Sequence, residues 1–319
     1  MFVAGPGGPP PGRGPQLSLH RVLAREFATD SATARDPDLR VFVSDLVRPY
    51  GLPVDEAALA AGRGHCYAEM AEQLLPALVA AEEAVDLLIL VFASPDVQPG
   101  RAAAVHLSRH CPGGPLAFAL CDQGAAGVFS ALRIAREFTR AGECGRALVL
   151  VAEQSQLHYR PAGPAPWPSR HTVVGLLCTA GEHGGLAAPT VHPAVAPARS
   201  GELLAAELRQ RADPGTVLLL GPGLAGAVGP GRAVGTAVTD GYAGVVRARD
   251  GSPYTGLWSA LAAGLPRWRA AGRGLLLADY DAGLGYLGLV EWPGREAPAR
   301  RGTTQAPETA RSFVRVLPC

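Results

Sequence analysis

Short apolar runs alternate along this chain with longer amphipathic stretches. Apolar runs of five or six residues bounded by Pro, Gly or charge are typical of buried strands, and apolar positions three or four apart are typical of helices. Strands are predicted over 39–43, 87–92, 116–121, 147–152 and 216–220. Helices are predicted from residue 55 and over 67–81, 101–109 and 125–140. This alternation predicts a layered α/β protein.

Three segments depart from that pattern. Residues 1–18 are dominated by Gly and Pro in their first fifteen positions, and we expect a disordered tail there. Residues 154–170 contain four prolines, and we expect a surface or interface excursion. Residues 296–319 are expected to form a C-terminal extension.

An internal repeat relates the two halves of the chain. Gly127-Val-Phe-Ser-Ala-Leu132, followed by Gly145-Arg-Ala-Leu-Val-Leu150, is similar to Gly256-Leu-Trp-Ser-Ala-Leu261, followed by Gly272-Arg-Gly-Leu-Leu-Leu277. Each pair reads as a helix that opens with Gly and ends in an Arg-marked turn into a buried strand. The repeat predicts a duplicated unit, with an N-terminal half over 38–195, including the excursion, and a C-terminal half over 196–295.

Composition narrows the classes of partner and compartment. The net charge is +1, and all 29 basic residues are arginines scattered among 28 acids, which argues against nucleic acid or an anionic membrane as partner. No signal peptide and no apolar run of about 20 residues is recognised. The six cysteines are widely spaced without a CxxC pair, so we expect reduced, mostly buried thiols in a cytoplasmic protein.

Four segments form an ordered series along the chain: 86–96 (Asp-Leu-Leu-Ile-Leu-Val-Phe-Ala-Ser-Pro-Asp), 116–120 with 127–132, 145–153, and the closing Gly-rich turn and strand of 283–292. Together they resemble the ketoacyl-ACP synthase III branch of the thiolase superfamily. The resemblance covers about residues 39–292. It implies a five-layer αβαβα fold of two duplicated halves that dimerises. It also implies that an acyl group is carried on a cysteine and is then condensed with, or transferred to, an acceptor. That acceptor is often tethered to acyl carrier protein.

The same resemblance implies a Cys-His-Asn active site, and this chain departs from it at all three positions. The cysteine position falls on Ala125 or Gly124, the histidine loop on 221–226, and the asparagine loop on 250–255. The chain contains no asparagine, and its last histidine is His192. We therefore expect a degenerate pocket, lined by Asp122, Gln123, Ala125, Gly221, Gly223 and Tyr254.

Cys121 is the remaining candidate nucleophile, three or four residues before the implied position. It is either a displaced acyl carrier or a buried cysteine at a strand end. The neighbouring Asp122 would raise the pKa of its thiol. Asp122 and Gln123 either line a modified pocket or cap the following helix, and His171 or His192 could replace a lost base.

Two further patterns suggest other chemistry. Residues 221–226, Gly-Pro-Gly-Leu-Ala-Gly, match the dinucleotide fingerprint, which requires a helix that opens on the glycines and an acid about 20 residues later. His106 and His110 have helical i, i+4 spacing beside Cys111, but no second ligand pair supports a metal site. Surface or dimer-contact histidines are the simpler interpretation.

The leading hypothesis is a ketosynthase III-like protein of fatty-acid or polyketide-type secondary metabolism without the standard condensing activity. It would act as homodimer or as heterodimer with an active ketosynthase, and would dock acyl carrier protein. One alternative is an acyltransferase that moves an acyl group from carrier protein or coenzyme A through Cys121; a weaker one is a nucleotide-dependent oxidoreductase. No resident cofactor or metal is expected, and a bound acyl-CoA or phosphopantetheine-linked acyl group would be substrate.

Overall fold

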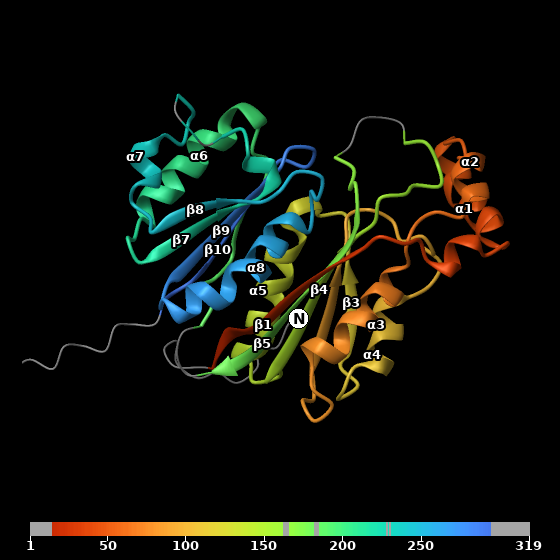
Figure 1. Ribbon diagram of the computed structural model, residues 1–319, viewed down its shortest axis with the longest axis horizontal. Helices are drawn as coiled ribbons and strands as arrows, with labels where there is room; N and C mark the ends of the chain where they lie inside the picture. Colours follow the sequence, from red (N-terminus) through yellow and green to blue (C-terminus); the bar gives the residue numbers. More distant parts are fainter. Residues whose placement is uncertain (1–14, 162–165, 182–184, 228, 230, 295–319) are drawn as a thin grey trace, which may run out of the picture.

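Two five-stranded sheets of the same topology form the framework of the protein (Figure 1). The computed structural model describes residues 15–161, 166–181, 185–227, 229 and 231–294. In spatial order, the first sheet contains β1 (Gln16–Phe27), β5 (His171–Gly181), β4 (Arg146–Glu153), β2 (Leu87–Val91) and β3 (Leu116–Leu120). The second contains β6 (Thr190–His192), β10 (Tyr286–Trp292), β9 (Gly274–Asp281), β7 (Thr216–Leu220) and β8 (Gly244–Arg247).

The pairing confirms the predicted duplication. In the first sheet β2 runs parallel to both β3 and β4, and β5 and β1 add antiparallel strands. In the second sheet β7 runs parallel to β8 and β9, and β10 and β6 add antiparallel strands. Each strand of one half thus has a counterpart at the same place in the other, which is the predicted thiolase-like arrangement.

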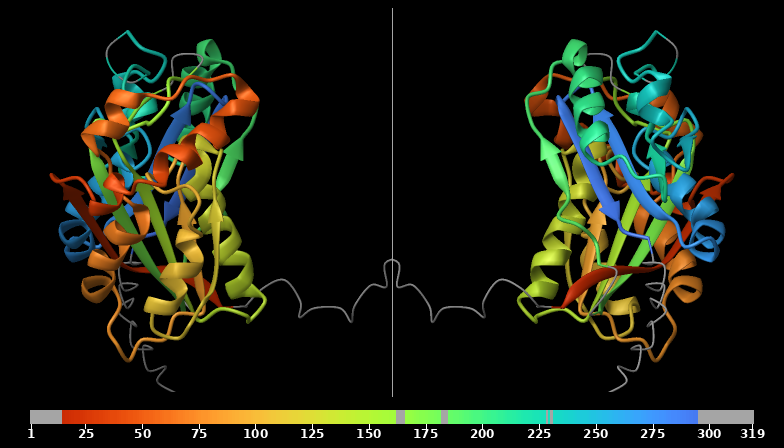
Figure 2. Two further views of the ribbon diagram at one scale, coloured as in Figure 1. Left: turned by 90° about the vertical axis from the view of Figure 1, so that its right-hand side faces the viewer. Right: turned by 90° about the vertical axis from the view of Figure 1, so that its left-hand side faces the viewer.

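The helices complete five layers, αβαβα. Between the sheets lie α5 (Gly127–Arg140) and α8 (Gly256–Ala270). The outer face of the first sheet is covered by α3 (Tyr67–Leu78) and α4 (Ala103–His110), with α1 (Leu39–Val47) and α2 (Glu56–Ala61) at one side. The second sheet is covered by α6 (Pro197–Gln210), near α7 (Thr236–Thr239). Figure 2 shows these two outer faces.

The central layer is where the two halves meet. Phe129 of α5 and Trp258 of α8 pack edge to face with ring centroids 5.3 Å apart. Phe129 also fills the space above Gly288 of β10, where a Cβ atom would lie 2.5 Å from its ring. Strands covered on both faces become continuously apolar, which is why β2 and β7 were recognisable from sequence.

Two predictions about the N-terminal region are wrong. Residues 39–43, expected to be a strand, begin α1, and the buried Leu39, Val43 and Val47 recur every four residues along one helix face. The expected tail reaches into β1, which starts at Gln16; residues 1–14 lie outside the described residues. Leu17, Leu19 and Val22 of β1 are buried against the central core.

The expected boundaries of the halves also shift. β1 belongs to the first sheet although the N-terminal half was expected to begin at residue 38. β6 pairs with β10, so the second sheet begins before residue 196. The described part of 154–170 contains no helix, and its one strand-like contact is the isolated bridge between Val54 and Tyr159. Residues 296–319 lie outside the described part of the chain.

No helix among the described residues has both the length and the apolar character needed to cross a membrane.

Candidate functional site

The N-terminus of α5 faces the end of β9, and a carboxylate fills the space between them. After β3 the chain turns through Asp122, with φ of 60°, and a short 3-10 turn over Gly124–Ala126 leads into α5. Asp281, the last residue of β9, accepts a hydrogen bond at Oδ2 from the N–H of Ala125 at 3.0 Å. Its Oδ1 accepts from the N–H of Leu284 at 2.9 Å. Asp281 therefore binds one N–H group of the 3-10 turn that leads into α5.

The position of Asp281 limits which side chains fit at the implied cysteine position. A Cβ atom at Gly124 would lie 1.7 Å from Asp281 Oδ2, so no side chain fits there while Asp281 holds its place. Ala125 is buried and carries only a methyl group. The nucleophile position is therefore empty of reactive side chains, and the adjacent N–H group is already bonded to an anion.

The implied histidine loop is packed directly onto the same strand. Asp279 is buried and accepts hydrogen bonds at Oδ1 from the N–H groups of Gly223 at 3.1 Å and Tyr280 at 2.8 Å. A Cβ atom at Gly221 would lie 1.9 Å from Asp279 Cγ, and one at Gly223 would lie 1.7 Å from the Tyr280 carbonyl oxygen. Because the loop lies so close to β9, only glycine fits at these two positions. Burial raises the pKa of Asp279 to about 8, so its carboxyl is mostly protonated at neutral pH.

The implied asparagine loop is held by a buried acid of the other half. Glu153, at the end of β4, accepts from the N–H of Tyr254 at 2.9 Å and from the Thr255 hydroxyl at 2.5 Å. Burial raises the pKa of Glu153 despite these bonds. The Tyr254 hydroxyl donates to the carbonyl of Pro166 at 3.0 Å and so ties the excursion to this loop. Burial also raises the pKa of Tyr254 to about 12, so at neutral pH it is a phenol and not a base.

These elements enclose a cavity of about 270 Å³. It is lined by Ala125, Pro166, Trp167, Pro222, Gly223, Gly251, Pro253, Tyr254, Tyr280, Asp281 and Ala282. Of the predicted pocket residues, Ala125, Gly223 and Tyr254 line it, whereas Asp122, Gln123 and Gly221 do not. Neither a thiol nor an imidazole is present in this lining. Asp281, the charged group of the cavity, was not among the predicted residues.

Cys121 is exposed, so it is not the buried strand-end cysteine that was one of the two expectations. With Asp122 it lines a separate cavity of about 670 Å³ beside the edge strand β3, together with apolar residues such as Phe92 and Phe118. Partial burial and the Asp122 carboxylate raise the pKa of the Cys121 thiol, as predicted for the effect of Asp122. No histidine lines this cavity.

The two histidines considered as replacement bases both lie outside these cavities. His171 begins β5, is buried, and lies with Nε2 3.4 Å from Asp30 Oδ1. His192 lies in β6 with Nε2 2.9 Å from Glu207 Oε1. Neither lines the cavity at α5 or the cavity at Cys121.

The fingerprint at 221–226 does not have the geometry of a dinucleotide site. The glycines lead into a 3-10 turn of three residues, Pro222–Leu224, rather than a long helix whose N-terminus could receive a pyrophosphate. Gly221 and Gly223 are covered by Asp279 and Tyr280. This geometry gives no support to the weaker alternative of a nucleotide-dependent oxidoreductase.

Comparison with known proteins identifies the fold. No protein-family model and no curated sequence matches the chain significantly. Among solved structures it is similar to 3-oxoacyl-(acyl carrier protein) synthase III from Pseudomonas aeruginosa PAO1, with TM-score 0.54 and 16% identity over 87% of this chain and 98% of that one. The tetronic acid condensing enzyme AbyA1 gives TM-score 0.55 and 17% identity over 87% and 100%.

A third similar structure is 3-oxoacyl-[acyl-carrier-protein] synthase III from Aquifex aeolicus VF5, with TM-score 0.51 and 16% identity over 88% of this chain and 98% of that one. The similarity runs through both duplicated halves. The chain therefore has the fold of the thiolase-superfamily condensing enzymes, as the sequence resemblance predicted.

Proposed function

We propose that this protein is a noncondensing, ketosynthase III-like subunit that assembles with an active ketosynthase of a fatty-acid or polyketide-type pathway. In that assembly it would shape the acyl pocket of its partner and help to dock acyl carrier protein. The observation that carries the proposal is the Asp281 carboxylate at the N-terminus of α5, bonded to Ala125 N at 3.0 Å.

The chemistry of condensation explains why this carboxylate matters. Acyl transfer to a thiolate and decarboxylative condensation both develop negative charge, which donors such as helix-end N–H groups stabilise. A fixed carboxylate bound to the Ala125 N–H, just before α5, would repel a thiolate, an oxyanion and an enolate alike. With only Ala125 at the implied nucleophile position, the site has neither the nucleophile nor a positive field to activate one.

A surface suited to a partner subunit supports the second part of the proposal. β3 forms one edge of the first sheet, so one side of its backbone is open to pairing with another strand. The Leu116 side chain on β3 is 56% exposed, and Val105 on the adjacent α4 is 48% exposed. The cavity of about 670 Å³ opens beside this edge. A related subunit that adds its own edge strand would cover these apolar side chains.

The test is to purify this protein, a candidate partner ketosynthase III from the same organism and a carrier protein, and to assay each alone and together. The proposal expects no condensation by this chain alone, co-elution with the ketosynthase, and a change in rate or product chain length in the mixture. Leu116→Asp should prevent co-elution. Gln210→Asp, which adds the same charge at an exposed position of α6, should not. Condensing activity of this chain alone would contradict the proposal.

One observation favours a second candidate, an acyltransferase that uses Cys121. The exposed thiol lines the larger and mainly apolar cavity, which could receive an acyl chain. The raised pKa of the thiol and the absence of histidine from that lining weigh against it. A mass increase on Cys121 after incubation with acyl-CoA, lost in Cys121→Ser, would favour the acyltransferase.

A further inference from the structure

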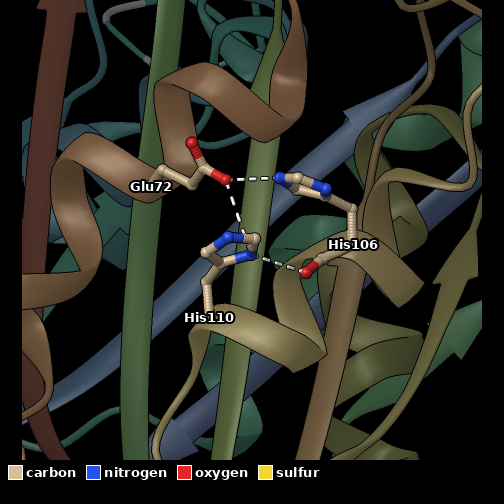
Figure 3. A group of neighbouring side chains, drawn as sticks. All are labelled: Glu72, His106 and His110. Atoms are coloured by element: carbon tan, nitrogen blue, oxygen red, sulfur yellow. Dashed lines mark hydrogen bonds and ion pairs between the residues drawn. The ribbon is translucent and has the colours of Figure 1, made fainter.

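Three potential metal ligands converge on the outer layer of the first half (Figure 3). His106 and His110 lie one turn apart on α4, and Glu72 comes from the neighbouring α3. One ligand atom of each residue lies within 4.8 Å of the other two. His106 Nε2 contacts Glu72 Oε1, and His110 Nδ1 lies 3.6 Å from the same oxygen.

We propose that Glu72, His106 and His110 bind a divalent cation of the zinc class and so connect α3 to α4. Imidazole nitrogen and carboxylate oxygen bind Zn²⁺ at about 2.0–2.2 Å, which places neighbouring ligand atoms of a tetrahedral site about 3.4 Å apart. The separation of 3.6 Å between His110 Nδ1 and Glu72 Oε1 is already close to this value. The His106–Glu72 contact opens to admit the ion, and water takes the fourth position.

The surroundings favour an ion that enters from solvent. The side chains of His106, His110 and Glu72 are 47%, 51% and 34% exposed, so no part of the core has to open. The two imidazole rings are 4.4 Å apart between centroids, and both stand on one rigid helix. His110 Nδ1 also lies 3.0 Å from the His106 carbonyl oxygen, so ligation through Nδ1 exchanges that contact for the metal.

Cys111, which adjoins the pair in sequence, is not part of the site. Its side chain is buried in the core beneath α4, whereas the ligand atoms of Glu72, His106 and His110 meet at the surface. The third ligand is instead Glu72, 34 residues before His106 in sequence, which no spacing rule connects to the histidine pair.

The site is separate from the cavity at Asp281. α3 and α4 cover the outer face of the first sheet, whereas the cavity at Asp281 lies where α5 begins, on the inner face. The competing interpretation is an exposed ion pair between Glu72 and His106, with His110 nearby, which would hold no ion. An experiment must therefore separate a three-ligand site both from that pair and from chelation by the two histidines alone.

Isothermal titration of the full-length protein with ZnCl₂ makes that separation. The protein should carry no polyhistidine tag and should contain Cys121→Ser and Cys319→Ser, which remove the exposed thiol and the cysteine outside the described residues. We expect one Zn²⁺ per chain, with the affinity reduced at least tenfold in each of His106→Ala, His110→Ala and Glu72→Gln. His20→Ala, which removes an exposed histidine on β1, should leave the affinity unchanged.

Thermal unfolding provides a second readout, because an ion that binds only the folded protein raises Tm. Saturating Zn²⁺ should raise the Tm of the parent protein and leave the Tm of Glu72→Gln nearly unchanged. The proposal is overturned if no ion binds, if Glu72→Gln binds as tightly as the parent, or if binding survives in both histidine variants. Circular dichroism of each variant in the absence of metal establishes that a loss of binding is not a loss of fold.

Discussion

Asp281 changes the chemistry available at the start of α5 because it places a carboxylate against the Ala125 N–H. Its Oδ2 lies 3.0 Å from Ala125 N. Gly124, the residue before Ala125, has no space for a side chain beside it. A thiol introduced beside this carboxylate would have a raised pKa and would react slowly, since the thiolate is the reactive form.

An introduced cysteine can report this effect directly. In a Cys121→Ser background, Ala125→Cys should react slowly with iodoacetamide at pH 7, and adding Asp281→Asn should accelerate the reaction about tenfold because a negative charge is removed. Asp45→Asn, a change at an exposed acid on α1, serves as control and should not alter the rate. Equal rates with and without Asp281→Asn would mean that the carboxylate does not govern this position.

Asp279 makes a separate prediction about stability and pH. Its pKa is about 8 in the folded protein against an ordinary value of 3.8, so the folded state holds a proton that the unfolded state releases between these values. This contribution to stability is complete below about pH 4 and is lost as the pH rises toward 8, at up to about 1.4 kcal/mol per pH unit.

Urea unfolding at pH 5 and pH 8 measures this contribution. Asp279→Asn keeps an oxygen that can accept from Gly223 and Tyr280 but cannot titrate. The free energy of unfolding of the parent protein should fall more between pH 5 and pH 8 than that of Asp279→Asn. If both proteins show the same change with pH, the carboxyl is ionised throughout and its pKa is not raised.

The elements themselves were predictable where burial alone decides the pattern. β2, β3, β4 and β7 appear as apolar runs, and α3, α4 and α5 follow from helical spacing. A window of five residues could not separate a strand from the start of α1, whose buried positions recur only every fourth residue. β1 was missed because Gly and Pro dominate the residues before it and its outer side chains are polar.

The contact between α5 and β10 gives a prediction at the scale of elements. A methyl group at Gly288 would lie 2.5 Å from the Phe129 ring, which is held in turn by Trp258. Gly288→Ala should therefore lower the free energy of unfolding by about 1–3 kcal/mol through overpacking. Gly226→Ala is the matched control, because a Cβ atom there meets nothing within 4 Å. A neutral Gly288→Ala would indicate a looser central layer.

The candidate site shows where inference from sequence ended. The absence of asparagine, and of any histidine after His192, predicted the loss of the implied groups, and Ala125, Gly223 and Tyr254 were placed in the cavity. Asp281 was not predicted, because it is separated from Ala125 by 156 residues in sequence and lies beyond the repeat, which ends at Leu277. Glu72 was missed beside His106 because it, too, is distant in sequence.

At the scale of the whole molecule, the duplicated framework is intact, and the proposed function implies that its reactive centre is altered. Both sheets, the central helices and the open edge at β3 have the arrangement of a condensing enzyme fold. The three loops that would supply its reactive groups are instead fixed by Asp281, Asp279 and Glu153. Under the proposed function, these contacts would preserve the shape of the chain for assembly with an active partner.

The most direct test of this account is the intact mass of the purified full-length chain after incubation with acyl-CoA and, separately, with acyl carrier protein loaded with an acyl group. The account predicts an unchanged mass under both conditions, because no residue at the start of α5 can accept the acyl group. A single acyl increment that maps to residues 121–127 would contradict it.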